Sequence, residues 1–171
     1  MKNNVFIVGT GGREDSLRWK LTQEGADVFK LGTYNEIYNH NDIRDELRDA
    51  GFEWRGTSDT ESLLAGIDKW GLEKTLKKAV GMFAFALWDK EKRELSLARD
   101  RMGEKPLYYG VQNSTFFFGS ELKAIRRHPY FEPNIDQNAL ASFLRFSYVP
   151  APFSIYKGIK KLLPGQFINL K

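Results

Sequence analysis

The chain has 171 residues, the length of one domain, and its 42% hydrophobic and 14% aromatic content is sufficient for a buried core. A formal net charge of +4 is too small to indicate nucleic-acid binding by itself. The 171 residues include no cysteine, which excludes disulfides, thiolate catalysis and cysteine-zinc sites within them and fits a reducing cytosol.

The sequence offers few histidines and no pattern of a membrane-spanning or signal segment. The two histidines, His40 and His128, are far apart in sequence, so neither a metal site nor a histidine-based triad is predicted, although carboxylates alone can bind a hard cation. The sequence has no run of about 20 apolar residues, and its Met-Lys-Asn-Asn start lacks the pattern of a cleaved signal peptide. We therefore expect a soluble cytoplasmic protein that binds neither membrane nor nucleic acid.

The first predicted elements are a strand, a glycine turn and a helix. Residues 4–9 (NVFIVG) form a short apolar run, and Gly9, Gly11 and Gly12 precede a stretch compatible with a helix. Glycines before a helix N-terminus can hold a phosphate group, because unpaired N–H groups and the helix dipole face the anion. A tight turn between strand and helix explains the same glycines, so both interpretations remain open.

Two amphipathic helices are predicted next. Asn41 or Asp42 caps the first helix, which ends at Gly51. Ser58, with Glu61 three residues later, forms a capping box for the second helix. The apolar stripe of the second helix comprises Leu63, Leu64, Ile67 and Trp70.

The pattern then changes to a period of two residues, which is typical of strands. After a short helical segment at 72–79, both faces of the segment 83–88 are apolar, so we expect a central strand there. Charged residues at 89–93 and a second turn at 112–114 predict two β-hairpins. Further elements are predicted at 120–127 (helix), 136–146 (helix) and 166–170 (strand). Together they predict an α+β fold, a layered sandwich of mostly antiparallel sheets with flanking helices.

Several segments resemble the asparagine synthetase family. Four of them are EIYNH with NDIRDEL (36–47), SDTE (58–61), GMFAFALWD (81–89) and ARDRMGEKPLYYG (98–110). Three later ones resemble the family's connection toward its second domain: FGSELKAI (118–125), YVPAP (148–152) and GIKKLLPGQF (158–167). They occur in the family's order over most of the chain.

The resemblance implies an N-terminal-nucleophile glutaminase fold and a two-step reaction. In that family a cysteine attacks the side-chain amide of glutamine, and the ammonia reaches a second domain that activates aspartate with ATP and magnesium. Asp59 matches the aspartate that binds the substrate α-ammonium group, and Glu36 matches a glutamate that follows the oxyanion pair. Read as bare residues, Asp59 stabilises a helix dipole and Glu36 is a solvent-facing strand carboxylate.

The resemblance breaks down at the catalytic groups, so no catalytic residue is predicted. Asn35 stands where family members have an Asn-Gly pair, so one oxyanion donor is misplaced, at a cost of about 3 to 4 kcal/mol of barrier. The nucleophilic cysteine is missing, and neither Thr10 nor Ser16 sits at a free amine that could act as its base. A stretch that carries the family's first strands and its carboxylate-binding arginine is missing too, so we expect those strands to be missing or replaced.

Within the segment ARDRMGEKPLYYG, the residues Asp100, Arg101, Lys105 and Tyr109 look like a catalytic cluster. A glycine-proline turn with flanking ion pairs explains them more simply. We therefore predict that this segment forms a turn beside the glutaminase pocket and contributes to the core next to it.

The opening residues resemble a different family. Segment 4–21 is similar to the first strand, glycine turn and helix of phosphoribosylamine–glycine ligase, with Asp15 at the usual position of a histidine. We therefore divide the chain into an atypical opening segment at 1–32 and an amidotransferase-like domain at 33–171, which we expect to end before any synthetase domain.

Three functions remain open. The first is the glutaminase domain of an asparagine synthetase, inactive for lack of cysteine and without a cofactor of its own, since ATP and magnesium would belong to the absent synthetase domain. The second is a module that holds glutamine or docks on a synthetase-like partner through residues 137–171, which include five basic and no acidic residues. A solvated surface explains that stretch as well. The third is a nucleotide or phosphosugar binder that uses Gly9, Gly11 and Gly12.

Overall fold

The computed structural model describes residues 5–7, 26–30 and 36–171. The described strands are β1 (Val5–Ile7), β2 (Ala26–Lys30), β3 (Glu36–Ile37), β4 (Gly81–Met82), β5 (Ala84–Asp89), β6 (Glu94–Arg99), β7 (Tyr108–Gln112), β8 (Thr115–Gly119), β9 (Ile159–Lys161) and β10 (Phe167–Leu170). The described helices are α1 (His40–Asp49), α2 (Asp59–Trp70), α3 (Leu72–Lys78), α4 (Leu122–Ile125) and α5 (Gln137–Phe146).

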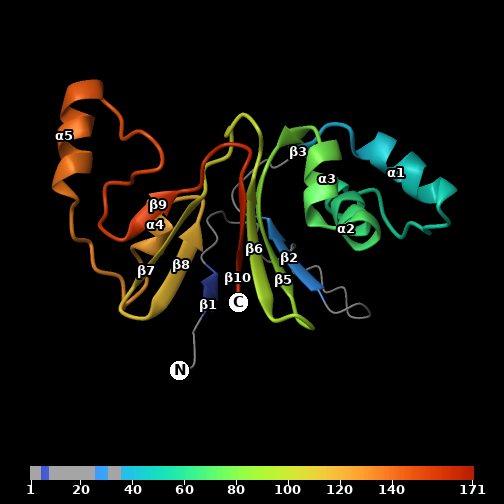
Figure 1. The fold of residues 1–171 in the computed structure, drawn as a ribbon, viewed down its shortest axis with the longest axis horizontal. Coiled ribbons are helices and arrows are strands. Elements are labelled where there is room, and N and C mark those ends of the chain that lie inside the picture. The colour runs from blue at the N-terminus through green and yellow to red at the C-terminus, as the bar shows by residue number, and fades with distance from the viewer. Residues whose placement is uncertain (1–4, 8–25, 31–35) are drawn as a thin grey trace.

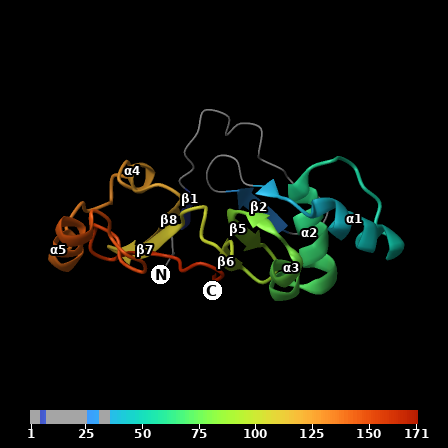
Figure 2. The ribbon, with the colours of Figure 1, turned by 90° about the horizontal axis from the view of Figure 1, so that it is seen from above.

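Two four-stranded sheets stand side by side in the centre of the molecule (Figure 1). Their strand orders are β1-β8-β7-β9 and β10-β6-β5-β2, and β3 pairs with β4 in a third, two-stranded sheet. The β1–β8 pairing is parallel, whereas the other described strand pairs are antiparallel. Helices α1 to α3 lie at one end of the molecule, and α4 and α5 lie at the other (Figure 2). The predicted α+β layering is therefore confirmed.

Strand β5 shows why the sheets are layered in this way. Its alanines Ala84 and Ala86 pack between the two sheets, in a cluster that also contains Phe118 of β8. Phe85 and Leu87 point the other way and pack against the buried side chains of α1 and α2. A strand that is apolar on both faces must be covered on both, and β5 lies between β6 and β2 in its sheet. The prediction of a central strand is confirmed.

Strand β8, in the other sheet, also packs apolar side chains on both of its faces. Phe118 contributes to the layer between the sheets, and its neighbour Phe117 packs on the opposite face with Ile125 of α4. Successive side chains of a strand alternate between faces, so consecutive phenylalanines serve two layers. The preceding turn places Asn113 and Ser114 at φ +48° and +58°, a geometry that joins β7 and β8 in a tight hairpin.

The first helix starts earlier than predicted. It begins at His40 with Asn39 as its N-terminal boundary residue, so the prediction of Asn41 or Asp42 as its cap is wrong. The Asn39 side chain makes tertiary contacts instead, donating to the Lys78 carbonyl at 3.0 Å and accepting from the Val80 amide at 2.8 Å. The predicted end at Gly51 agrees with its φ of +87° just after the helix.

The C-terminal elements follow the sequence patterns closely. Asp136 caps α5 by accepting from the amides of Asn138 and Ala139 at 2.9 and 3.1 Å, and Ser147 ends it at φ +62°. The strand predicted at 166–170 is β10, and the helix predicted at 120–127 is the shorter α4. Strands β2, β4 and β9 were not predicted, because each is defined by pairing with a strand that is distant in sequence. The alternative reading of Glu36 as a strand carboxylate agrees with its place in β3. In the described part of the chain, no helix combines the length and apolar character needed to cross a bilayer.

The opening strand enters the central architecture. Residues Val5–Ile7 pair with Phe116–Phe118 of β8, so the apolar run predicted as a strand is one, and it extends the first sheet. The predicted glycine turn, with Gly9, Gly11 and Gly12, and the helix after it lie outside the described residues, as does Asn35.

Strands β3 and β4 approach each other closely at Gly81. A Cβ atom at this position would lie 2.1 Å from the Glu36 carbonyl oxygen and 2.9 Å from the Ile37 Cα, both of which belong to the backbone. Only glycine therefore fits without separating the two strands.

We predict that Gly81→Ala lowers the free energy of unfolding by about 2 kcal/mol or more, because the backbone of β3 must move. Gly51→Ala is the matched control, since Gly51 also has a positive φ, +87°, but a Cβ atom added there would meet no atom within 4 Å. The control should lose about 1 kcal/mol from backbone strain alone. Urea unfolding measures both losses, and equal losses would contradict the close-approach argument.

Candidate functional site

Two of the residues selected from the sequence meet at the junction of β3 and α2. Asp59 is the first residue of α2, and its Oδ2 accepts a hydrogen bond from the Ile37 amide at 3.0 Å. Ile37 is buried, and its neighbour Glu36 is exposed on the same strand. The fold thus brings Asp59 against the backbone of Ile37, the residue that follows Glu36, across a separation of 22 residues in sequence.

The N-terminus of α2 is capped, but only half of the predicted capping box forms. The Ser58 hydroxyl accepts from the Thr60 amide at 3.2 Å, as expected of an N-cap serine. The Glu61 carboxylate turns to the preceding loop instead, where it accepts from the Arg55 amide at 2.8 Å and the Gly56 amide at 3.0 Å. The predicted return of Glu61 to Ser58 is therefore replaced by bonds that fold the loop 55–58.

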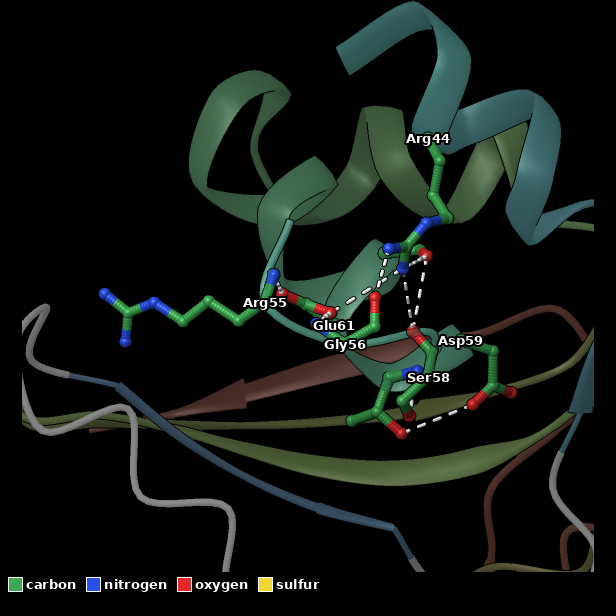
Figure 3. A network of polar contacts seen from close by, with 8 residues as sticks. Arg44, Arg55, Gly56, Ser58, Asp59 and Glu61 are labelled. Carbon is green, nitrogen blue, oxygen red and sulfur yellow. Dashed lines mark hydrogen bonds and ion pairs between the residues drawn. The ribbon is translucent and has the colours of Figure 1, made fainter. Parts of the chain in front are cut away.

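A buried arginine from α1 joins this loop to both helices (Figure 3). The Arg44 Nη1 atom lies 3.6 Å from Glu61 Oε2 and donates to the Ser58 carbonyl at 3.5 Å. Its Nη2 atom donates to the Gly56 carbonyl, and the guanidinium lies 3.9 Å from the ring centroid of Trp54. The side chains of Arg44 and Glu61 are each less than a tenth exposed. This buried network fixes the residue directly before Asp59.

Sequence reasoning missed Arg44. The one signal was its position between Ile43 and Leu47, two buried residues of the α1 apolar stripe. A charged residue beside a stripe is usually solvated, and only the tertiary structure shows that this one is enclosed.

Negatively charged side chains lie near the Tyr38 phenol, next to the strand that Asp59 contacts. Glu36 and Tyr38 are exposed on either side of the buried Ile37, and the Tyr38 amide continues the pairing with a bond of 2.7 Å to the Val80 carbonyl. Desolvation is the largest cause of the raised pKa of the Tyr38 phenol. The negative charges of Glu104, Glu36 and Asp100 raise that pKa further. Such a surface favours a cation over an anion.

The turn after β6 is bonded to the residue that follows β4. The Asp100 carboxylate is fully buried and accepts from the amides of Phe83, Glu104 and Lys105 at 3.3, 3.0 and 3.0 Å. Arg99 donates to the carbonyls of Gly103 and Lys105 at 2.6 and 2.7 Å, and burial lowers its pKa. These bonds to backbone groups define the turn. Asp100 thereby holds the chain where it leaves β4, the partner of β3.

Arg101 and Tyr109 of this segment contact other parts of the fold. Arg101 donates to the Ala79 carbonyl at 2.6 Å, at the end of α3. Tyr109 lies partly buried in β7, against the layer between the two sheets. The four residues that look like a catalytic cluster in sequence are therefore distributed over a turn and a strand. Among the residues that the structure describes, no three histidine, aspartate or glutamate side chains gather to hold a metal ion.

The comparison with protein families decides the affiliation. A family model described as a glutamine amidotransferase domain matches residues 23–171. The chain belongs to this family. The match begins inside the segment 1–32, so the boundary proposed at residue 32 stays a prediction.

Relatives of this amidotransferase domain are asparagine synthetases. The glutamine-hydrolysing asparagine synthetase 3 of Bacillus subtilis is 40% identical over 160 residues, which are 93% of this chain and 25% of that protein. A putative asparagine synthetase of Mycobacterium tuberculosis is 36% identical over 173 residues, covering 99% of this chain and 26% of its own length. The chain thus spans about a quarter of the length of the curated relatives that it matches.

The fold comparison agrees with the family. The glutamine phosphoribosylpyrophosphate amidotransferase of Bacillus subtilis matches 59% of this chain with a TM-score of 0.52 and 22% sequence identity, and the match covers 23% of that chain. At this level of identity the likeness concerns the fold alone. It supports the layered arrangement of helices and sheets in which the β3–α2 junction is found.

For this amidotransferase domain we predict that Glu61→Gln lowers the free energy of unfolding by about 3 kcal/mol, because the Arg44 charge stays buried without its partner. The double variant Arg44→Met/Glu61→Gln should lose less than the sum of the single losses. Urea unfolding of the three variants measures this coupling.

Glu73→Gln is the control for this cycle. Glu73 pairs with Lys77 at 2.7 Å on the surface of α3, where both side chains are more than half exposed. Its loss should leave the unfolding free energy unchanged within error, because solvent screens such a pair. Additive losses at Arg44 and Glu61 would show that the buried pair is not a coupled unit.

Proposed function

We propose that this amidotransferase domain binds glutamine at the junction of β3 and α2, with Asp59 and Glu36 holding the α-ammonium group. The observation that carries the proposal is the 3.0 Å bond between Asp59 Oδ2 and the Ile37 amide, which joins the two sequence segments that resemble the family's glutamine site. The domain is of the asparagine synthetase type, as its similarity to those relatives supports.

The charges around the junction support an ammonium ligand. Asp59 and Glu36 contribute two carboxylates, and the Tyr38 phenol beside them has a raised pKa that reflects burial first and neighbouring negative charge second. A fixed cation such as an α-ammonium group gains most where opposite charges are preorganised on rigid elements. The rigid element here is the loop before α2, which the buried pair of Arg44 and Glu61 anchors.

Asp59 also stabilises the α2 dipole, because a carboxylate in the first turn of a helix interacts with the partial positive charge there. The two roles predict different effects of an isosteric change. If Asp59 served the helix alone, Asp59→Asn would lower stability and leave glutamine binding intact.

We infer further that the chain binds glutamine without hydrolysing it. Opening the amide requires a nucleophile with an adjacent base, and the 171 residues contain no cysteine. ATP and magnesium would serve the ligase reaction of a separate domain, so we propose no cofactor at the junction of β3 and α2. A nucleotide site on Gly9, Gly11 and Gly12 stays a sequence hypothesis, since those residues lie outside the described ones.

Isothermal titration calorimetry with L-glutamine tests the binding proposal. The wild-type chain should give heat with a single site, and Asp59→Asn should bind at least about tenfold more weakly, a difference of about 1.4 kcal/mol. The asparagine oxygen can still accept from the Ile37 amide, so the change removes the charge and little else.

Glu73→Gln serves as the matched control here too, because it removes another first-turn helical carboxylate, on α3 instead of α2. It should bind glutamine like the wild type. Equal affinity of the Asp59→Asn and wild-type chains, or no heat from the wild type, would reject the proposal.

A second experiment tests catalysis. We predict no ammonia release above the buffer rate when the purified chain is incubated with glutamine, measured with a coupled glutamate dehydrogenase assay. Intact-mass spectrometry of the same mixture should show no covalent glutamyl adduct, because no thiolate is available to form one. Turnover or an adduct would require a nucleophile other than cysteine.

A further inference from the structure

Three half-buried side chains lie near one another where strands β6, β7 and β9 end or begin, and we call them the donor cluster. They are Arg99 at the end of β6, Tyr108 at the start of β7 and Lys161 at the end of β9. Tyr108 and Lys161 are direct partners in the pairing of β7 with β9, so their side chains project from the same face of the sheet. Arg99 Nη1 donates to the carbonyl of Leu162, the residue after Lys161, at 2.6 Å.

Neither cation of the donor cluster forms an ion pair with a residue that the structure describes. Arg99 gives three N–H groups to backbone carbonyls, and Lys161 gives one to the Val149 carbonyl. The carboxylate of Asp100, next to Arg99 in sequence, accepts from three backbone amides instead. A half-buried charge without a counter-ion is unfavourable, because the protein solvates it less well than water does. Two such charges close together therefore favour a bound anion.

The pKa values of these groups agree with uncompensated positive charge. Burial is the largest cause of the lowered pKa of Arg99 and of the lowered pKa of Lys161. The positive charge of Arg99 lowers the pKa of Lys161 further. Within the described chain, both influences on Lys161 thus disfavour its charged form, and an anion bound beside it would act in the opposite direction.

The donor cluster also has unused hydrogen-bond donors. An arginine side chain carries five N–H donors and a lysine ammonium group carries three, so Arg99 and Lys161 each keep two after their bonds to carbonyls. The Tyr108 phenol makes no hydrogen bond within the described chain. At the same end of the sheet, Ser120 follows Gly119, the pairing partner of Tyr108, and its buried hydroxyl has no hydrogen-bond partner among the described residues. The group therefore offers donors and positive charge to a ligand that only accepts.

We propose that the donor cluster binds a phosphate group, which Arg99 and Lys161 hold by charge-assisted hydrogen bonds and the Tyr108 hydroxyl holds by a neutral one. Phosphate oxygens accept from several directions at once, and arginine and lysine both bind them well. A carboxylate has only two oxygens in one plane, so it can meet fewer donors that come from three different strands.

The phosphate site is separate from the proposed glutamine site. Strands β7 and β9 belong to the sheet that contains β8, whereas the junction of β3 and α2 lies with helices α1 to α3 at the other side of the molecule (Figure 1). Binding at one site can therefore be measured and lost without the other.

Isothermal titration calorimetry with inorganic phosphate tests the site, with sodium chloride holding the ionic strength equal in cell and syringe. The wild-type chain should give saturable heat for one site. Lys161→Gln should bind phosphate at least about tenfold more weakly, because it removes one of two positive charges. Tyr108→Phe should bind severalfold more weakly, because it removes a single neutral donor.

Lys160→Gln is the matched control. Lys160 is the exposed neighbour of Lys161 on β9, its side chain projects from the opposite face, and its substitution makes the same change in net charge. This variant should bind phosphate like the wild type. The proposal is wrong if the wild type gives no heat with phosphate, if both lysine variants lose affinity equally, or if malonate binds more tightly than phosphate.

Amine labelling of the wild-type chain tests the site without any substitution. Limited acetylation with acetic anhydride, read by mass spectrometry of chymotryptic peptides, reports the reactivity of Lys161 and Lys160 separately. Phosphate should slow acetylation of Lys161 relative to chloride of equal ionic strength, because a bound anion covers the amine and favours its charged form. Acetylation of Lys160 should stay unchanged. Equal slowing of both lysines, or of neither, would reject the phosphate site.

Discussion

The buried pair of Arg44 and Glu61 is the interaction on which the candidate site depends. Each side chain is less than a tenth exposed, and together they bind the backbone of the loop that precedes α2. Burying two charges is unfavourable unless the remaining donors and acceptors are satisfied. Here backbone carbonyls and amides complete the network, so the desolvation of the two charges is offset. The position of Asp59 follows from it.

The layered fold places the helices of this network, α1 and α2, at one end and helix α5 at the other (Figure 1). Between them, the two sheets share a dry layer in which Ala84 and Ala86 allow close approach to Phe118. The outer faces are covered separately, by α1 and α2 on one sheet and by α4 on the other. Each sheet therefore packs apolar side chains on both of its faces.

Membership of the family and catalytic chemistry are separate questions for this chain. The family match and the asparagine synthetase relatives establish a glutamine amidotransferase domain. Asp59 and Glu36 are the residues that we propose to orient glutamine, and the 171 residues contain no cysteine that could attack its amide. Substrate recognition and nucleophilic attack are separate physical tasks, one electrostatic and preorganised, the other covalent. A domain can retain the first without the second, which is the combination that we propose here.

The sequence by itself determined the local elements and the family. The alternation of 83–88 and the glycine after α1 each mark an element through a pattern that spans only a few residues. It also identified Asp59 and Glu36 as candidates, through motifs rather than through geometry.

Only the tertiary structure decided which groups meet. Glu61 leaves the predicted capping box for the loop before it, Asn39 bridges to the end of α3 instead of capping α1, and Arg44 becomes buried. Strand β9 exists because β7 pairs with it, and α5 is amphipathic in sequence yet uncovered in the fold. In each case the deciding partner is distant along the chain, and local propensity carries no information about a hydrogen bond or a burial that forms only when distant segments are brought together.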